Sequence, residues 1–303
     1  MDLKDVNTIG VVGAGTMGSG ITQVLVESGF TVYLFDETYE KAAEGKEKIT
    51  KRFEKTIEKK RYNREYVDKA TIDNINNLLL NIIPFKLNDL EFIEKPQLFI
   101  EVVFEDLNVK QTVFRELDRL CDPETILATN TSSIPIGEIA KAVNKTRKEK
   151  IIGAHFMNPP YILKLLEIIK SDYTSDETYK TIYDLAQKLG REPILTSKDT
   201  PGFLCNRILM PSILEALRTL EENVGNIKDT DLSVKAGVAG AMDVLKLGDL
   251  IGWDIVLDIT NVLRESYGSR YEPPYLLHYL VQEGYLGRKT KKGIFDFYNL
   301  RKE

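Results

Sequence analysis

The sequence predicts an α/β fold in which a doubly wound, mostly parallel sheet is followed by an all-α C-terminal domain. Three observations predict it. Apolar β-type runs alternate with helical patterns up to residue 198, a glycine-rich turn follows the first run, and β-type runs almost vanish after DTPGF at 199–203. Such alternation is typical of a parallel sheet covered by helices. We therefore expect one domain over residues 1–198 and a helical domain over residues 199–303.

The individual elements follow from the same patterns. The expected strands are residues 6–12, 31–35, 97–103, 125–129, 151–156, 163–169 and 192–196. The expected helices between them are residues 16–28, 38–61, 106–120 and 175–189. In the C-terminal domain, helical periodicity covers residues 206–224, 228–235, 249–267 and 274–283. The first of these has a broad apolar stripe, which is typical of a helix packed against a partner.

Composition restricts the class of protein. The net charge of −5 is far from the basic excess of nucleic-acid binders. No apolar run approaches the roughly 18–20 residues needed to span a bilayer, and the N-terminus lacks the pattern of a signal peptide. Cys121 and Cys205 are the only cysteines and form no CxxC pair. We expect a cytoplasmic protein with no nucleic acid, membrane or metal partner.

The stretch GVVGAGTMGSG contains the spacing G-x-G-x-x-G, and Asp36 follows 18 residues after its last glycine. Because the turn follows a strand and opens a helix, the context is that of a Rossmann-type dinucleotide site. A carboxylate at position 36 can accept hydrogen bonds from ribose and would repel a 2′-phosphate, which favours NAD over NADP. The alternative is a glycine-rich turn beside an ordinary surface Asp. The expected cofactor contacts are Gly13, Gly15, Thr16, Met17, Gly18 and Asp36.

His155 and Glu167 are candidates for acid–base chemistry. His155 ends an expected strand, at the sheet edge where α/β proteins bind ligands, and its unperturbed pKa of about 6.5 suits proton transfer. A short link through NPPY leads to the next strand, which carries Glu167 and could orient the imidazole. A satisfied core histidine and a solvent-facing Glu explain the same residues equally well. His278, in a helical pattern, is expected to be structural.

Other polar residues point to the same sheet edge. Ser132 and Ser133 lie in NTSS after one strand, the segment EVVFED at 101–106 follows another, and Asn206 opens the first C-terminal helix. Each could contact a substrate or the nicotinamide, but each alone is also typical of a helix cap or a turn.

The chain resembles the 3-hydroxyacyl-CoA dehydrogenase family, particularly its short members that act on 3-hydroxybutyryl-CoA. The resemblance runs nearly end to end. It rests on VVGAGTMGSGI, EVVFEDLNVKQTVF, ILATNTSSIPIGEIA, IIGAHFMNPPYILKLLEII, DTPGFLCNRILMP, LGDLIGWDIVL and YLGRKTKKGIFDFY.

This resemblance implies roles for particular residues. His155 matches the catalytic base, Glu167 its partner carboxylate, and Ser132 and Asn206 the residues that contact substrate. Positions that approach NAD in the family match Asp36, Glu101, Asn158 and Lys289. Basic residues around Lys59 and Lys60 match the contact with coenzyme A phosphates. The family is usually dimeric, which implies a homodimer formed through the helical domain.

Two segments depart from the family pattern and leave the substrate open. Residues 240–244 read GAMDV where the family generally has a Pro-Met-Gly-Pro turn. The form NPPY at 158–161 also occurs in relatives that oxidise free hydroxy acids such as gulonate or carnitine. One alternative is therefore a same-fold dehydrogenase of a free hydroxy acid. Another is a non-catalytic NAD-binding protein, because the family includes a lens crystallin.

Overall fold

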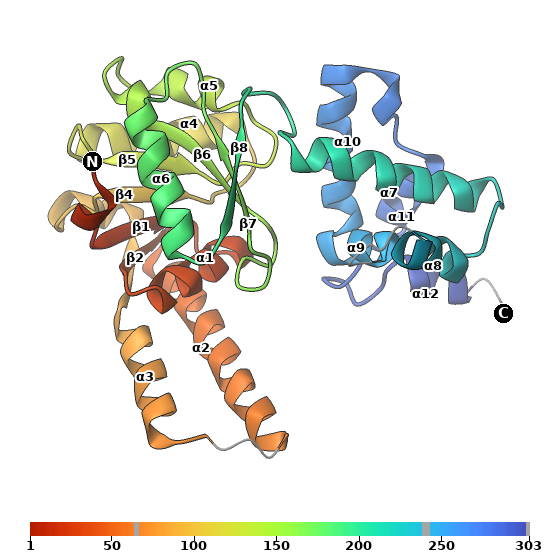
Figure 1. The fold of residues 1–303 in the computed structure, drawn as a ribbon, viewed down its shortest axis with the longest axis horizontal. Coiled ribbons are helices and arrows are strands. Elements are labelled where there is room, and N and C mark those ends of the chain that lie inside the picture. The colour runs from red at the N-terminus through yellow and green to blue at the C-terminus, as the bar shows by residue number, and fades with distance from the viewer. Residues whose placement is uncertain (64–66, 238–242, 301–303) are drawn as a thin grey trace. The chain divides into compact units, whose positions relative to one another are not determined.

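The computed structural model describes residues 1–63, 67–237 and 243–300 (Figure 1). The chain forms two compact units, Met1–Asp199 and Thr200–Glu303, called the N-terminal unit and the C-terminal unit below. Of the unusual segment at 240–244, residues 240–242 lie outside the described part of the chain.

The N-terminal unit contains an eight-stranded sheet in the order β3-β2-β1-β4-β5-β6-β7-β8. All neighbouring strands are parallel except β6 and β7, which confirms the expected doubly wound α/β fold. The strands are β1 (Thr8–Val12), β2 (Thr31–Asp36), β3 (Ile82–Lys86), β4 (Leu98–Glu101), β5 (Ile126–Thr129), β6 (Ile151–Phe156), β7 (Leu165–Ile169) and β8 (Glu192–Thr196).

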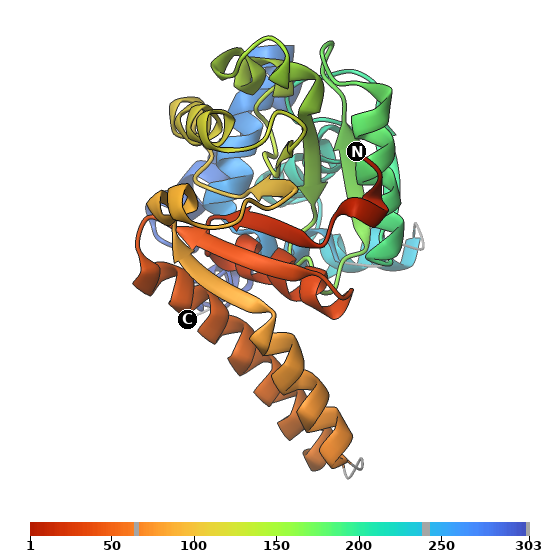
Figure 2. The ribbon, with the colours of Figure 1, turned by 90° about the vertical axis from the view of Figure 1, so that its left-hand side faces the viewer.

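Helices cover the sheet, and two of them extend away from it. The helices of this unit are α1 (Thr16–Glu27), α2 (Tyr39–Tyr62), α3 (Lys69–Leu80), α4 (Leu107–Leu120), α5 (Ile136–Ile139) and α6 (Asp176–Lys188). Short 3-10 helices lie at Leu3–Asp5, Leu87–Phe92, Ala140–Ala142 and Arg147–Lys150. In Figures 1 and 2, α2 and α3 run side by side as an arm that projects from the sheet. A buried apolar cluster from β1, β2, β4 and β6, with α1 and α6, forms the main core.

The C-terminal unit is helical in its described residues. Its helices are α7 (Cys205–Glu221), α8 (Ile227–Gly237), α9 (Val244–Ile251), α10 (Trp253–Tyr267), α11 (Tyr275–Gln282) and α12 (Ile294–Leu300), with a 3-10 helix at Ser269–Tyr271. Trp253 is fully buried in its core, and a Cβ on Gly248 would lie 2.2 Å from the Trp253 ring. Glycine therefore lets α9 approach the indole closely.

The structure differs from the expected elements in one predicted helix and in several elements that were not predicted. The predicted single helix over residues 249–267 is wrong, because Gly252 takes a φ of 105° and separates α9 from α10. Strand β3 and helix α3 were not predicted. Strand β3 contains Pro84, which is tolerated because β3 is an edge strand. Helix α12 was also missed.

The turn between β1 and α1 yields a stability prediction. A Cβ on Gly18 would lie 1.8 Å from the Gly13 carbonyl oxygen, whereas a Cβ on Gly15 would meet nothing within 4 Å. We expect Gly18→Ala to lower the free energy of unfolding by about 1–3 kcal/mol through overpacking. Gly15→Ala should cost less than about 1 kcal/mol, since only a helix N-cap preference is lost. Urea unfolding measures both, and equal effects would contradict the close-approach explanation.

Candidate active site

The glycine turn lies where the strand order reverses. Strand β1 has β2 on one side and β4 on the other, so the crevice at their carboxyl ends is the usual ligand position in such sheets. Gly13 takes a φ of 107°, and its N–H donates to the Phe35 carbonyl at 2.8 Å. Gly15 and Thr16 are exposed at the start of α1, whose first turn has no acidic residue. Free N–H groups at such a helix start suit a pyrophosphate.

Asp36 is held beside this turn. Its two carboxylate oxygens accept hydrogen bonds from the backbone N–H groups of Ala14, at 2.7 Å, and Glu37, at 2.8 Å. The side chain is half-buried at the end of β2. The carboxylate is therefore fixed next to the glycine turn, and its remaining lone pairs can accept hydrogen bonds from ribose hydroxyls.

His155 and Glu167 are direct partners across the antiparallel pair β6 and β7. The distance from His155 Nδ1 to Glu167 Oε2 is 2.8 Å, and the two residues are 5% and 0% exposed. The alternative of a solvent-facing Glu167 is therefore wrong. A carboxylate that accepts from Nδ1 places the proton on that nitrogen, which leaves the lone pair on Nε2. The pair has the arrangement of a general base with its orienting carboxylate.

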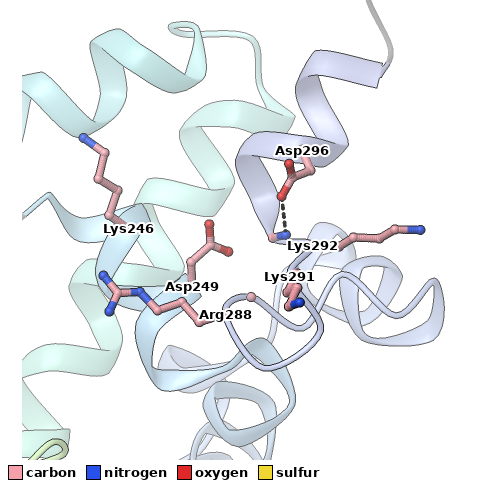
Figure 3. A pocket seen from close by; sticks show the side chains of 8 residues that line it. Lys246, Asp249, Arg288, Lys291, Lys292 and Asp296 are labelled. Atoms are coloured by element: carbon pink, nitrogen blue, oxygen red, sulfur yellow. Dashed lines mark hydrogen bonds between the residues drawn. The ribbon is translucent and has the colours of Figure 1, made fainter. Parts of the chain in front are cut away.

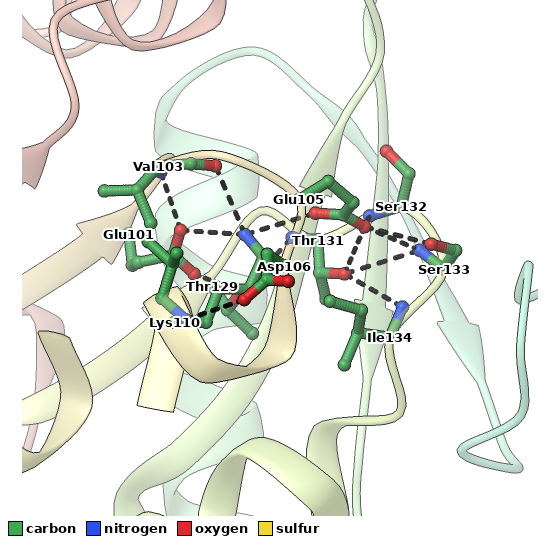
Figure 4. A network of polar contacts seen from close by, with 11 residues as sticks. Glu101, Val103, Glu105, Asp106, Lys110, Thr129, Thr131, Ser132, Ser133 and Ile134 are labelled. Carbon is green, nitrogen blue, oxygen red and sulfur yellow. Dashed lines mark hydrogen bonds and ion pairs between the residues drawn. The ribbon is translucent and has the colours of Figure 1, made fainter. Parts of the chain in front are cut away.

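Ser132 lies in a loop organised by Glu105, which the sequence analysis did not single out (Figure 4). Glu105 Oε1 accepts hydrogen bonds from Thr131 Oγ1 at 2.6 Å, from the Ser132 N–H at 2.8 Å and from the Ser133 N–H at 3.1 Å. One carboxylate oxygen thus fixes three successive residues of the NTSS segment. The segment EVVFED was expected at this edge, but the role of its second Glu was not.

Lys110 lies between two carboxylates at the base of this network. Its Nζ is 2.8 Å from Glu101 Oε1 and 3.2 Å from Glu105 Oε2, although the Lys110 side chain is only 1% exposed. Burial opposes the charge on Lys110, but the attraction of Glu101 and Glu105 outweighs it and raises the Lys110 pKa. Burial likewise works against ionisation of Glu105, but Lys110 and the Thr131 hydroxyl lower its pKa overall. The ammonium and the Glu105 carboxylate are therefore charged at neutral pH.

Glu101, expected to approach NAD, has its partners inside the protein. Its side chain is 0% exposed and accepts hydrogen bonds from Val103 N–H, Thr129 Oγ1 and Lys110. Glu101 therefore holds the loop after β4 in place. A direct contact between Glu101 and NAD would require these hydrogen bonds to break. Within the same segment, the carboxylate of Glu105 is partly exposed.

Asn130 connects the ends of three strands. Its side-chain oxygen accepts a hydrogen bond from the backbone N–H of Phe156 at 2.8 Å. The backbone N–H of Asn130 donates to the Glu101 carbonyl at 2.8 Å. Phe156 directly follows His155, so the loop with Ser132 and the strand with His155 share one buried link. The structure thus brings the glycine turn, Asp36, Ser132, His155 and Glu167 to one edge of the sheet.

The remaining expected site residues are Asn158 at the same edge, Lys59 and Lys60 on α2, and two residues of the C-terminal unit. Asn158 is exposed just after β6, and Lys59 and Lys60 are exposed near the end of α2. In the C-terminal unit, Asn206 is buried in α7, and Lys289 forms an ion pair with Asp254.

Two hollows lie away from this sheet edge. One, of about 670 Å³, is lined by residues that follow β7 and β8, including Lys170 and Ser197, and so lies at the opposite edge. The other, of about 290 Å³, is in the C-terminal unit (Figure 3). There Asp249 accepts hydrogen bonds from Trp253 Nε1 and the Ile294 N–H, which ties α9 to α12. None of the expected site residues lines either hollow.

Comparisons with known proteins match this arrangement. The NAD binding domain of 3-hydroxyacyl-CoA dehydrogenase matches residues 8–200, and the C-terminal domain of the same enzyme matches residues 202–297. The chain belongs to the 3-hydroxyacyl-CoA dehydrogenase family. The resemblance seen in the sequence and the expectation of NAD as cofactor are thereby confirmed. The chain is accordingly an NAD-dependent dehydrogenase of this family.

Individual relatives cover nearly the whole chain. A probable 3-hydroxybutyryl-CoA dehydrogenase of Bacillus subtilis is 38% identical over 97% of this chain and 98% of its own length. The 3-hydroxybutyryl-CoA dehydrogenase of Clostridioides difficile is 38% identical over 95% of this chain and 99% of its own. The crystal structure of (S)-3-hydroxybutyryl-CoA dehydrogenase PaaH1 from Ralstonia eutropha matches with a TM-score of 0.83. The sequence identity is 32%, and the match covers 95% of this chain and 98% of that chain.

No described helix has the length and apolarity required to cross a bilayer. Within the same residues, no cluster of three or more His, Cys, Asp or Glu side chains has the arrangement of a metal site.

The buried ammonium group yields a second stability prediction. Lys110→Met would leave Glu101 and Glu105 without their shared cation, so we expect a loss of about 3–5 kcal/mol in the free energy of unfolding. The matched control is Lys141→Met, which removes an exposed pair with Glu138 and should cost less than about 1 kcal/mol. Urea unfolding of both variants tests this, and equal losses would contradict a central role for Lys110.

Proposed function

We propose that this dehydrogenase oxidises a short-chain (S)-3-hydroxyacyl-CoA, such as 3-hydroxybutyryl-CoA, to the 3-oxoacyl-CoA, and catalyses the reverse reduction. The observation that carries the proposal is the 2.8 Å contact of His155 Nδ1 with Glu167, which leaves Nε2 as the base at the carboxyl edge of the sheet. The names of the Bacillus and Clostridioides relatives support the substrate class.

The turn after β1 fits NAD. Gly15 has open space where a Cβ would stand, the start of α1 carries no acidic side chain, and Asp36 is fixed beside the turn. Bound there, NAD supplies the acceptor for a hydride. Gly13, Gly15, Thr16, Met17 and Gly18 would contact its pyrophosphate, and Asp36 its adenosine ribose. Asn158 and Lys289 stay further predicted contacts from the resemblance.

His155 and Glu167 would manage the proton. His155 Nε2 removes the proton of the substrate hydroxyl as its carbon is oxidised, and becomes an imidazolium. Glu167, which has no exposed surface, stabilises that positive charge through Nδ1 and keeps the ring oriented. In the reverse direction, the imidazolium returns the proton to the new hydroxyl.

Further residues would hold the substrate. Ser132 and Asn206 would hydrogen-bond substrate oxygens. Lys60, with its neighbour Lys59, would bind coenzyme A phosphates at the end of the arm formed by α2 and α3, where both ammonium groups are exposed. Point charges of this kind are suited to phosphate.

We further propose that the protein works as a homodimer in the cytoplasm. The C-terminal unit exposes large apolar side chains, including Ile208, Val224, Leu232 and Tyr275, which are 56–77% exposed. Exposed apolar surface of this kind supports an interface between two copies.

The catalytic role of His155 yields a kinetic prediction. His155→Gln keeps a polar side chain of similar size but removes the base, so kcat should fall about 10²- to 10⁴-fold while NADH affinity is kept. His278→Gln is the matched control, because His278 is the other histidine and is exposed on α11. Steady-state kinetics and NADH fluorescence titration measure both quantities. Near-full turnover by His155→Gln would rule out the mechanism.

A substrate panel separates the competing functions. We expect NADH formation from (S)-3-hydroxybutyryl-CoA, little from gulonate or carnitine, and poor use of NADP because Asp36 repels a 2′-phosphate. Turnover of a free hydroxy acid without turnover of the CoA thioester would favour the alternative dehydrogenase. NAD binding with no turnover of any hydroxy compound would favour a crystallin-like role. The same panel run with butyryl-CoA, which lacks the hydroxyl, is the blank.

A further inference from the structure

The loop after β4, whose backbone approaches Gly13, carries an exposed aromatic residue. Phe104, in the loop after β4, is 80% exposed. Single exposed apolar side chains are common on protein surfaces, so exposure alone has no meaning here. The position of Phe104 in the sheet, near the point where the strand order reverses, indicates which ligand its ring could contact.

The loop that carries Phe104 forms one wall of the β1–β4 crevice. The Val102 N–H donates to the Val12 carbonyl at 2.8 Å, and a Cβ on Gly13 would lie 2.6 Å from the Val102 carbonyl oxygen. The two loops are therefore in contact at the floor of the crevice. Phe104 stands two residues beyond that contact.

The backbone around Phe104 is fixed on both sides. Before it, the Val103 N–H donates to Glu101 at 2.7 Å; after it, Glu105 holds the Thr131 hydroxyl and Lys110. The Phe104 carbonyl itself accepts from the Asp106 N–H at 2.8 Å. The ring is nevertheless left outside the core, so most of its aromatic surface is available to a ligand. Such a pre-organised apolar group is suited to a ligand.

The sheet order indicates which half of the dinucleotide the ring meets. Asp36, on β2, lies on the adenosine side of the glycine turn. Strand β4 lies on the other side, followed in the sheet by β5, whose loop carries Ser132, and then by β6 with His155. We propose that Phe104 packs against the nicotinamide riboside half of NAD and is a cofactor-binding residue of this chain. The proposal rests on NAD binding at the glycine turn.

The test compares Phe104→Ala with Phe92→Ala in the full-length protein. Phe92 is 83% exposed in the same unit but ends the 3-10 helix Leu87–Phe92, which precedes β4 at its amino end. Loss of a partly buried aromatic contact is worth roughly 5- to 30-fold in an equilibrium constant. Phe104→Ala should therefore raise the Kd for NADH roughly 5- to 30-fold, and Phe92→Ala should leave it within about twofold.

ADP serves as the second probe, because it has the adenosine and pyrophosphate parts but no nicotinamide riboside. Phe104→Ala should bind ADP as the wild type does, and Phe104→Leu should keep part of the NADH affinity. Unchanged NADH affinity in Phe104→Ala would overturn the proposal, as would an equal loss of ADP affinity, which would mean a displaced loop or an adenosine-side contact. Failure of the wild type to bind NADH would instead contradict cofactor binding itself.

Discussion

The arrangement of the site depends on one buried ammonium group. Lys110 Nζ forms ion pairs with both Glu101 and Glu105, although almost none of its side chain reaches solvent. Uncompensated carboxylates in such surroundings would be costly. With the charge present, Glu101 can hold Thr129 of β5, and Glu105 can hold the backbone that carries Ser132. One cation thus connects the loops after β4 and β5 at the carboxyl edge of the sheet.

The constraint extends from these loops to the proposed base. Asn130 accepts the Phe156 N–H, so the loop after β5 is fixed to the residue that follows His155. On the other side of His155, Glu167 supplies the orienting carboxylate from β7. A hydride transfer coupled to proton removal requires donor, acceptor and base to keep a defined geometry. Here the loop after β5 and the His155 ring are held by hydrogen bonds from buried side chains at neighbouring strand ends.

The parts of the site that could be predicted from the sequence are formed by residues close to one another in the chain. The glycine spacing and Asp36 share one β-α-β unit, and His155 and Glu167 share one strand–loop–strand, so short-range rules apply to both. Glu105 and Lys110 were missed because Glu105 binds residues 26–28 positions further on, and Lys110 has the pattern of an ordinary surface Lys on a helix. Strand β3 was missed because Pro84 interrupts its apolar run. The division of residues 249–267 required the positive φ of Gly252, which periodicity does not report.

The loop after His155 explains why the reaction type is easier to infer than the substrate. Pro160 packs on Gly20 of α1, Arg191 donates to the Pro160 carbonyl at 2.8 Å, and Arg52 of α2 stacks over the Tyr161 ring at 5.0 Å. The NPPY loop is therefore fixed to the helix whose far end carries Lys59 and Lys60. A His–Glu pair can serve any secondary alcohol, since it acts only on the hydroxyl proton. Under the proposed function, selection of a CoA thioester would therefore depend on residues distant from the pair, such as the exposed Lys59 and Lys60 of α2.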